Sequence, residues 1–195
     1  MTKRTICSRC HYPMTICLCH AISPLTIPVK LVVLQHPLET KHAKNTARLI
    51  KLCVPDCELM VGESAEDFNV LQETIKQQNI NAGVLYPHQH SMALESAKQR
   101  ADFTPPDTLI LIDATWRKAH KMWQLNPWLH SLPSWHFEQL PKADYRVRKS
   151  QLAHSLSTIE ATSHALQHLF NVDTQPLITV FNAMQKNIEQ FIPKC

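Results

Sequence analysis

Four cysteines near the amino terminus have the spacing of a metal site. The pattern is C-x2-C-x6-C-x-C, formed by Cys7, Cys10, Cys17 and Cys19. Four thiolates in so short a segment can surround one ion tetrahedrally, and zinc is the usual occupant of a closed sulfur site. Because C-x-C is the less usual half, His11 or His20 is an alternative fourth ligand, and reduced cysteines without metal are the competing interpretation. We predict a structural zinc site.

A second group that could do chemistry is Asp113, Thr115 and Trp116, which follows the apolar run TLILI. Ligand crevices in open α/β sheets form at the carboxyl ends of strands, so a carboxylate, a hydroxyl and an indole there are well placed for catalysis. The structural alternative is that Asp113 or Thr115 caps the next helix while Trp116 and Trp123 fill its buried face. The local pattern alone favours this alternative.

Cations are concentrated in three segments of the chain. Eleven of the 20 lysines and arginines lie there, namely Lys41, Lys44, Arg48, Lys51, Arg117, Lys118, Lys121, Lys142, Arg146, Arg148 and Lys149. On a helix, the spacing of the first four would form one stripe, whereas six of the 16 acids lie between residues 56 and 73. Such segregation is expected of a face that follows a phosphate backbone. The alternative is a solvated helix face without a partner.

The glycine content excludes two classes of nucleotide-binding protein. The chain has only Gly62 and Gly83. A G-x-G-x-x-G fingerprint and a Walker A loop each need at least two glycines within a few residues. The sequence therefore excludes Rossmann dehydrogenases and P-loop NTPases, and any nucleotide-like cofactor must be held by side chains and ordinary loop backbone.

Apolar runs alternate with segments of helical periodicity along the chain. We predict strands at 29–35, 57–61, 82–86, 108–113 and 134–140. We predict helices at 41–52, 64–78, 94–101, 115–125, 157–170 and 176–192, with Ser64 and Asp67 starting the second. Alternation of this kind is typical of β-α-β crossovers, so we expect an α/β fold with a parallel sheet and flanking helices.

Composition bounds the domain organisation and the compartment. With 195 residues, 44% of them hydrophobic, we expect residues 1–28 to form the zinc module and a linker, and 29–195 one main domain. Neither a membrane helix nor a signal peptide is evident, so we expect a cytoplasmic protein that does not bind membranes. Its cysteines should be reduced, with Cys53, Cys57 and Cys195 as core or surface thiols. The oligomeric state stays open, with a monomer slightly favoured.

Taken together, these motifs resemble the DTW-domain family. The name-giving motif D-x-T-W is matched by Asp113, Thr115 and Trp116, and the cysteine cluster matches the family's N-terminal zinc motif. The two remaining blocks are His36-Pro37-x-Glu39 with Asn45-Thr46-x-Arg48-Leu49, and Tyr145-Arg146-x-Arg148-Lys149 with Ser157-Thr158-x-Glu160-Ala161. The resemblance spans residues 7 to about 161, and four blocks in the family's order make it specific.

The resemblance implies a SPOUT-like fold whose knotted C-terminal half binds S-adenosylmethionine. It also implies a reaction, the transfer of the 3-amino-3-carboxypropyl group of that cofactor to N3 of a uridine in tRNA, which releases methylthioadenosine. Two alternatives stay open from the sequence. One is a SPOUT-type RNA methyltransferase that presents the methyl group, and the other is a non-catalytic zinc-ribbon protein that binds RNA.

The same resemblance suggests a role for individual residues. Asp113 would be the general base for uracil N3, Thr115 would orient it, and Trp116 would stack on adenine or uracil. The expected cofactor pocket comprises Tyr86, Pro87, Ile112, Trp116, Leu156, Ser157 and Thr158, with His36 nearby. Glu160 is expected to be structural, because S-x-x-E before an apolar helix is a capping box. Arg48, Arg146 and Arg148 could bind phosphates or the cofactor carboxylate. Apart from Lys142, the clustered cations are the expected tRNA contacts.

Overall fold

The computed structural model describes residues 5–42, 44–139 and 156–190. Within these ranges, six strands form one sheet in the order β2-β1-β5-β3-β6-β4, and every adjacent pair is parallel. The strands are β1 (Lys30–Gln35), β2 (Glu58–Val61), β3 (Ala82–Leu85), β4 (Met92–Ala93), β5 (Thr108–Asp113) and β6 (Ser134–His136). The predicted α/β class and parallel sheet are confirmed.

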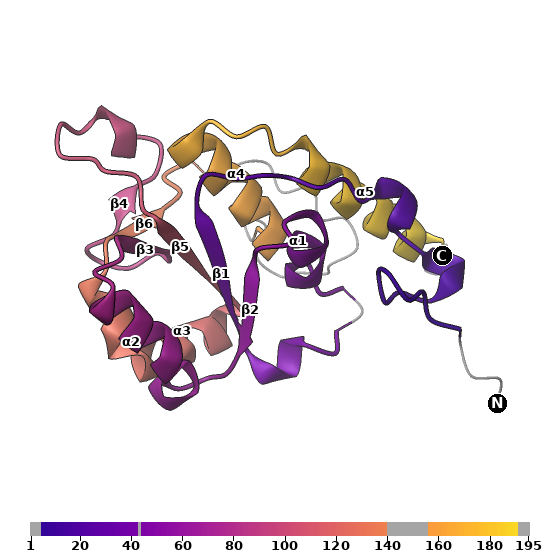
Figure 1. Cartoon of the computed structure of the whole chain (residues 1–195), viewed down its shortest axis with the longest axis horizontal. Helices are drawn as coiled ribbons and strands as arrows, with labels where there is room; N and C mark the ends of the chain where they lie inside the picture. Colours follow the sequence, from indigo (N-terminus) through magenta and orange to yellow (C-terminus); the bar gives the residue numbers. More distant parts are fainter. Residues whose placement is uncertain (1–4, 43, 140–155, 191–195) are drawn as a thin grey trace.

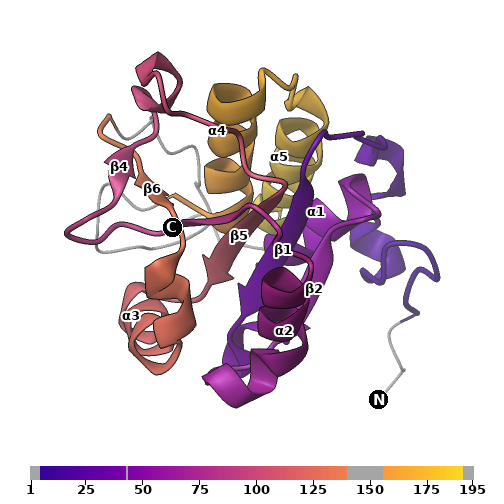
Figure 2. The ribbon, with the colours of Figure 1, turned by 60° about the vertical axis from the view of Figure 1, so that its left-hand side comes forward.

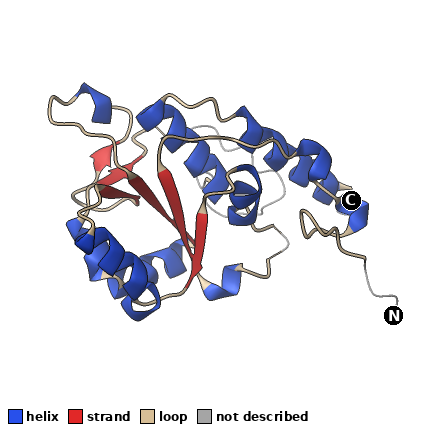
Figure 3. Ribbon diagram, viewed as in Figure 1, coloured by secondary structure: helices blue, strands red, loops and turns tan. Residues whose placement is uncertain are grey.

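Helices cover both faces of the sheet (Figure 1; Figure 3). One layer consists of α2 (Asn69–Gln77) and α3 (Trp116–Leu125). The other layer consists of α1 (Ala47–Cys53), α4 (Thr158–Phe170) and α5 (Gln175–Glu189). Figure 2 shows the two layers on opposite sides of the central strands, and each layer has its own buried apolar cluster.

The central strands are apolar on both faces because both faces are covered. In β5, Leu109 and Leu111 pack into the cluster that includes α1, α4 and α5, while Ile110 packs into the cluster on the α2 and α3 side. This is why the sequence reads as a continuous apolar run rather than an alternation. Asp113, the last residue of β5, lies two positions beyond Leu111, and side chains two positions apart in a strand point to the same face. The Asp113 side chain is therefore on the side of α1, α4 and α5.

The helix predicted over 41–52 is shorter than expected, since α1 begins only at Ala47. The side-chain Oδ1 of Asn45 accepts a hydrogen bond from the N–H of Arg48 at 3.1 Å, in the manner of a helix cap. Lys41 and Lys44 therefore precede the helix, and the prediction of a single cationic stripe along it is wrong.

Other element boundaries also differ from the prediction. Residues 94–101 contain only the 3₁₀ turn Ala97–Gln99, and the short strand β4 was not predicted. The expected strand over 134–140 ends at His136. The predicted helix start at Ser64 is confirmed, because Ser64 and Asp67 form a capping box on the 3₁₀ turn Ala65–Phe68 that leads into α2.

The expected knot involves residues outside the described ranges. The connection from β6 to α4 runs through 140–155, so the knotted C-terminal half stays a prediction. Cys53 and Cys57 are buried, as expected of core thiols. A search of the described residues found no helix long and apolar enough to span a membrane.

Gly83 provides a test of how β3 and β6 pack. A Cβ atom at this position would lie 2.2 Å from Cζ3 and 2.5 Å from Cη2 of Trp135. Gly83→Ala should therefore lower the free energy of unfolding by about 1–3 kcal/mol, as overpacking usually does. Urea denaturation would measure the loss. In a Trp135→Leu background the same substitution should cost much less, and an equal cost in both backgrounds would contradict this packing.

Candidate functional site: a cysteine cluster and a polar network at the sheet edge

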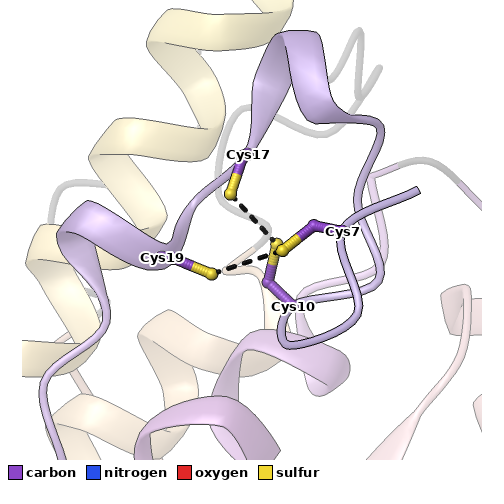
Figure 4. A group of neighbouring side chains, drawn as sticks. All are labelled: Cys7, Cys10, Cys17 and Cys19. Atoms are coloured by element: carbon purple, nitrogen blue, oxygen red, sulfur yellow. Dashed lines mark hydrogen bonds between the residues drawn. The ribbon is translucent and has the colours of Figure 1, made fainter. Parts of the chain in front are cut away.

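The four predicted zinc ligands lie together at the amino-terminal end of the described chain (Figure 4). Their sulfur atoms are all within 4.8 Å of one another. The Cys7 and Cys19 sulfurs are 3.5 Å apart, and the Cys10 and Cys17 sulfurs are 3.7 Å apart. Tetrahedral zinc with sulfur ligands needs separations of about 3.8 Å. The cluster therefore fits a zinc ion, and neither His11 nor His20 is needed to complete it.

Backbone geometry prepares this cluster for metal. The N–H of His11 donates to the Cys7 carbonyl at 2.9 Å, and His11 has a left-handed φ of 57°. This tight turn directs backbone N–H groups of Cys10 and Arg9 at the Cys7 sulfur, which lowers the pKa of the Cys7 thiol to about 6. Desolvation raises the pKa of the Cys19 thiol to about 12, so metal binding, which requires thiolates, would release protons from the cluster.

The cysteine module packs into the main core instead of standing apart. Cys10, Tyr12 and Leu18 are buried in the same cluster as α1, α4 and α5. The Tyr12 hydroxyl lies 3.9 Å from the Met184 sulfur of α5, and Asn187 of the same helix donates to the carbonyl of Ile16 at 3.2 Å. The position of the metal loop is therefore tied to the helices beside the sheet.

Asp113 is buried at the carboxyl end of β5 and both of its carboxylate oxygens accept hydrogen bonds. Gln35, its register partner in β1, donates from Nε2 to Oδ2 at 2.6 Å. The Thr158 hydroxyl, at the start of α4, donates to Oδ1. The Asp113 side chain is 8% exposed. Its carboxylate is thus oriented by two donors from separate elements, one of them among the predicted cofactor residues.

The structural alternative for the D-x-T-W motif holds for Trp123, which is buried, but not for Trp116. Thr115 occupies the N-cap position of α3 but makes no side-chain capping bond, and Asp113 is bonded to Gln35 and Thr158 instead. Trp116 begins α3 with 48% of its surface exposed, whereas Trp123 is buried. An exposed indole three residues beyond a buried carboxylate leaves a flat surface available at the sheet edge.

A polar network connects three of the sequence blocks. Gln35 Nε2 also donates to Asn45 Oδ1 at 3.3 Å, and Asn45 Nδ2 donates to the carbonyl of Glu39 at 3.2 Å. The N–H of His36 donates to the Asp113 carbonyl at 3.1 Å. Sequence reasoning missed Gln35, although a polar residue that ends an otherwise apolar strand is a usable signal.

The remaining predicted cofactor residues differ in their surroundings. Ser157 and Glu160 form the expected capping box at α4, with Ser157 Oγ donating to Glu160 Oε2 at 2.6 Å, which confirms a structural role for Glu160. Tyr86 lies on the other side of the sheet, where its ring stacks on Trp123 at 4.6 Å. Pro87, Ile112 and Leu156 have no polar side chain to assign.

The predicted RNA-contacting cations differ in their surroundings. Lys118 is paired with Glu39 at 2.8 Å, and Lys121 with Glu63 at 3.0 Å. Hydrogen bonds from Lys121 and His36 lower the pKa of Glu63. Lys51 donates to the carbonyls of Pro55 and Cys57. Lys41, Lys44 and Arg117 are exposed, while Arg146, Arg148 and Lys149 lie outside the described residues.

The fold and the two sites define a parallel α/β protein with a cysteine metal cluster and a polar strand-end site that includes the D-x-T-W motif. The profile of the DTW domain matches residues 4–189. The chain belongs to the DTW domain family.

Curated relatives carry one functional name. The tRNA-uridine aminocarboxypropyltransferase 2 of Drosophila melanogaster is 29% identical over 169 residues, which cover 84% of this chain and 66% of that protein. The protein of the same name from Mus musculus is 27% identical over 171 residues, covering 86% and 57%. The tRNA-uridine aminocarboxypropyltransferase A of Arabidopsis thaliana is 28% identical over 134 residues, covering 62% and 50%. This chain thus spans half to two thirds of these relatives. No solved structure matches it.

The cysteine cluster predicts the metal content of the protein. Purified protein should contain about one zinc ion per chain, measured by plasma emission spectrometry. The Cys7→Ser, Cys10→Ser double variant should lose the metal and melt at a lower temperature, because the module shares the main core. A Cys53→Ala, Cys57→Ala variant removes the same number of thiols and should keep its zinc. Equal zinc content in both double variants would contradict the ligand assignment.

Proposed function

We propose that this protein transfers the 3-amino-3-carboxypropyl group of S-adenosylmethionine to N3 of a uridine in tRNA. One observation carries the proposal: the buried carboxylate of Asp113, at the carboxyl end of β5, is held by hydrogen bonds from Gln35 and Thr158. Membership of the DTW domain family and the names of the curated relatives support this reaction over methyl transfer or RNA binding alone.

The proposed cofactor site is at the carboxyl edge of β3 and β5. Leu85, the last residue of β3, pairs with Leu111 of β5, so Tyr86 follows β3 beside the end of β5 at Ile112 and Asp113. Thr158 reaches the same edge from α4 through Asp113. S-adenosylmethionine, when bound, supplies an electrophilic carbon attached to a sulfur that leaves as a neutral thioether. Apolar strand ends suit its adenosine part, and no glycine-rich loop is required. The knotted arrangement expected for this half of the chain is part of the proposal.

Asp113 is the proposed general base. Uracil N3 becomes a good nucleophile only when its proton leaves, so a carboxylate with a fixed direction is the group that the reaction needs. Gln35 and Thr158 fix that direction. Trp116, free of core packing, would stack on the uracil or on the adenine. Thr115, which makes no capping bond, would lie between the base and the ring and help to orient them.

The proposed tRNA contacts are the clustered cations that the sequence singled out. Lys41, Lys44 and Arg117 are exposed and suited to phosphate oxygens. Lys118 and Lys121 are held by Glu39 and Glu63, so each would contact RNA only by giving up or sharing its carboxylate. A cytoplasmic location, expected from the sequence, is consistent with a tRNA substrate and stays part of the proposal.

The reaction predicts specific products. Protein incubated with unmodified tRNA and cofactor labelled in the carboxypropyl chain should give labelled 3-(3-amino-3-carboxypropyl)uridine after digestion, together with methylthioadenosine. Mass spectrometry of nucleosides and small products measures both. Release of S-adenosylhomocysteine with a methylated nucleoside would instead identify a methyltransferase, and no cofactor binding at all would leave only an RNA-binding role.

Asp113→Asn tests the assignment of the base. The amide has nearly the same shape, so cofactor and tRNA binding should change little, while single-turnover transfer should fall about 10²-fold or more. Because Asn offers one acceptor where two are used, the melting temperature should also fall modestly. Asp107→Asn, an exposed position just before β5, is the matched control. An Asp113→Asn enzyme that transfers at the wild-type rate would remove Asp113 as the base.

Charge reversal tests the tRNA surface. Lys41→Glu with Arg117→Glu should weaken the binding of all tRNAs and reduce the dependence of affinity on salt, by about one unit of slope for each phosphate that the protein no longer neutralises. The matched control reverses Lys76 and Lys98, which are exposed but lie outside the three cationic segments. Filter binding at several salt concentrations measures both. Equal effects of the two double variants would mean that only net charge matters.

A further inference from the structure

The metal module has an unusually direct connection to the site around Asp113. The connection begins at Tyr12, two residues beyond the ligand Cys10. The Tyr12 carbonyl accepts a hydrogen bond from the N–H of Cys7 at 2.8 Å, which closes the metal loop. The Tyr12 ring is 3% exposed and belongs to the core shared with α1 and α5. The ring therefore belongs both to the loop that carries the cysteines and to the main core.

Arg48 of α1 lies against this ring. Its guanidinium carbon is 4.2 Å from the centroid of the Tyr12 ring, which is the geometry of a cation–π contact. Among the described residues, the buried Arg48 Nε atom has no hydrogen-bond partner. The Arg48 residue as a whole is only partly buried. The part of its side chain at Nε is therefore packed against the protein beside the Tyr12 ring and is not in water.

The backbone of Arg48 continues the connection toward β1 and β5. Its N–H donates to Asn45 Oδ1 at 3.1 Å, and the same oxygen accepts from Gln35 Nε2 at 3.3 Å. Gln35 Nε2 in turn donates to Asp113 Oδ2 at 2.6 Å. Contacts are thus continuous from the metal loop, through Tyr12, Arg48, Asn45 and Gln35, to the carboxylate.

We propose that Arg48 is a positioning residue, which makes the orientation of the Asp113 carboxylate depend on the metal-bound state of the cysteine module through the Tyr12 ring contact. This gives Arg48 a role other than the phosphate contact expected from the sequence. When the metal dissociates, the loop releases the Tyr12 ring, Arg48 separates from that ring, and the hydrogen bonds of Asn45 and Gln35 loosen. Only the catalytic consequence rests on the proposed function, because the structural coupling does not require activity.

Hydrogen exchange at single amides, followed by NMR on the full chain, tests the coupling without activity. The reporters are the His36 N–H, bonded to the Asp113 carbonyl, and the Arg48 N–H, bonded to Asn45. Removing zinc with a chelator should raise exchange about tenfold at both. The Val84 N–H, bonded to Pro133 across the sheet, is the control and should not change.

Variants show whether the coupling runs through Arg48. In zinc-bound Arg48→Met, exchange at His36 should already be raised, and chelation should add little there. Arg48→Lys, which keeps a cation over the ring, should restore much of the protection. Tyr12→Leu removes the same ring contact from the other side and should raise exchange at His36 as Arg48→Met does, so it tests the coupling even if Arg48→Met folds poorly. Normal protection at His36 in zinc-bound Arg48→Met and Tyr12→Leu would overturn the proposal, as would an equal response to chelation in wild type and Arg48→Met.

Transfer kinetics and tRNA affinity together distinguish a positioning role of Arg48 from a direct contact with phosphate. If the proposed function holds, Arg48→Met should slow single-turnover transfer about tenfold at unchanged tRNA affinity and zinc content, with recovery in Arg48→Lys. Arg100→Met, which breaks an exposed ion pair with Asp102, is the control. Weaker tRNA binding with a shallower salt dependence, at a normal rate on bound tRNA, would show that Arg48 contacts phosphate and would overturn the proposal. Normal exchange results with no transfer in wild type would instead count against the proposed function alone.

Discussion

The site at the end of β5 depends on the hydrogen bonds that Gln35 and Thr158 donate to the carboxylate of Asp113. A buried carboxylate without donors is strongly unfavourable, so Gln35 of β1 and Thr158 of α4 must reach it for the strand end to be stable. That requirement joins the centre of the sheet to a helix 45 residues away in sequence. It also fixes the direction of the carboxylate, which is the property a general base needs. In the proposed mechanism, stability and chemistry therefore use the same contacts.

Residues from three of the sequence blocks also meet in one hydrogen-bond network around Asp113. Asn45 links Gln35 to the backbone of α1 and of the loop after β1, and Glu39 of that loop holds Lys118 of α3. The D-x-T-W motif is thus supported on both sides of the sheet. The cysteine module joins the same core through Cys10, Tyr12 and Leu18.

Sequence reasoning succeeded where local physics decides. The buried strands 30–35 and 108–113, the capping boxes of Ser64 and Ser157, and the cysteine spacing all follow from residues within a few positions of one another. It failed where distant contacts decide. Gln35 acquires its role only through the register with β5, 78 residues away, and α1 begins late because the Asn45 side chain binds the backbone of Arg48. Helical spacing alone favoured a core position for both Trp116 and Trp123, because it cannot tell which tryptophan the sheet covers, and only Trp123 is buried.

The proposed mechanism requires the Asp113 carboxylate to act as a base whose direction is set by its donors. Thr158→Val tests it most directly, because valine has nearly the same shape as threonine and lacks only the hydroxyl that donates to Asp113. Single-turnover transfer, measured with saturating cofactor and tRNA, should be about tenfold slower, while tRNA affinity and zinc content stay unchanged. Transfer at the wild-type rate in a folded Thr158→Val protein would contradict the account.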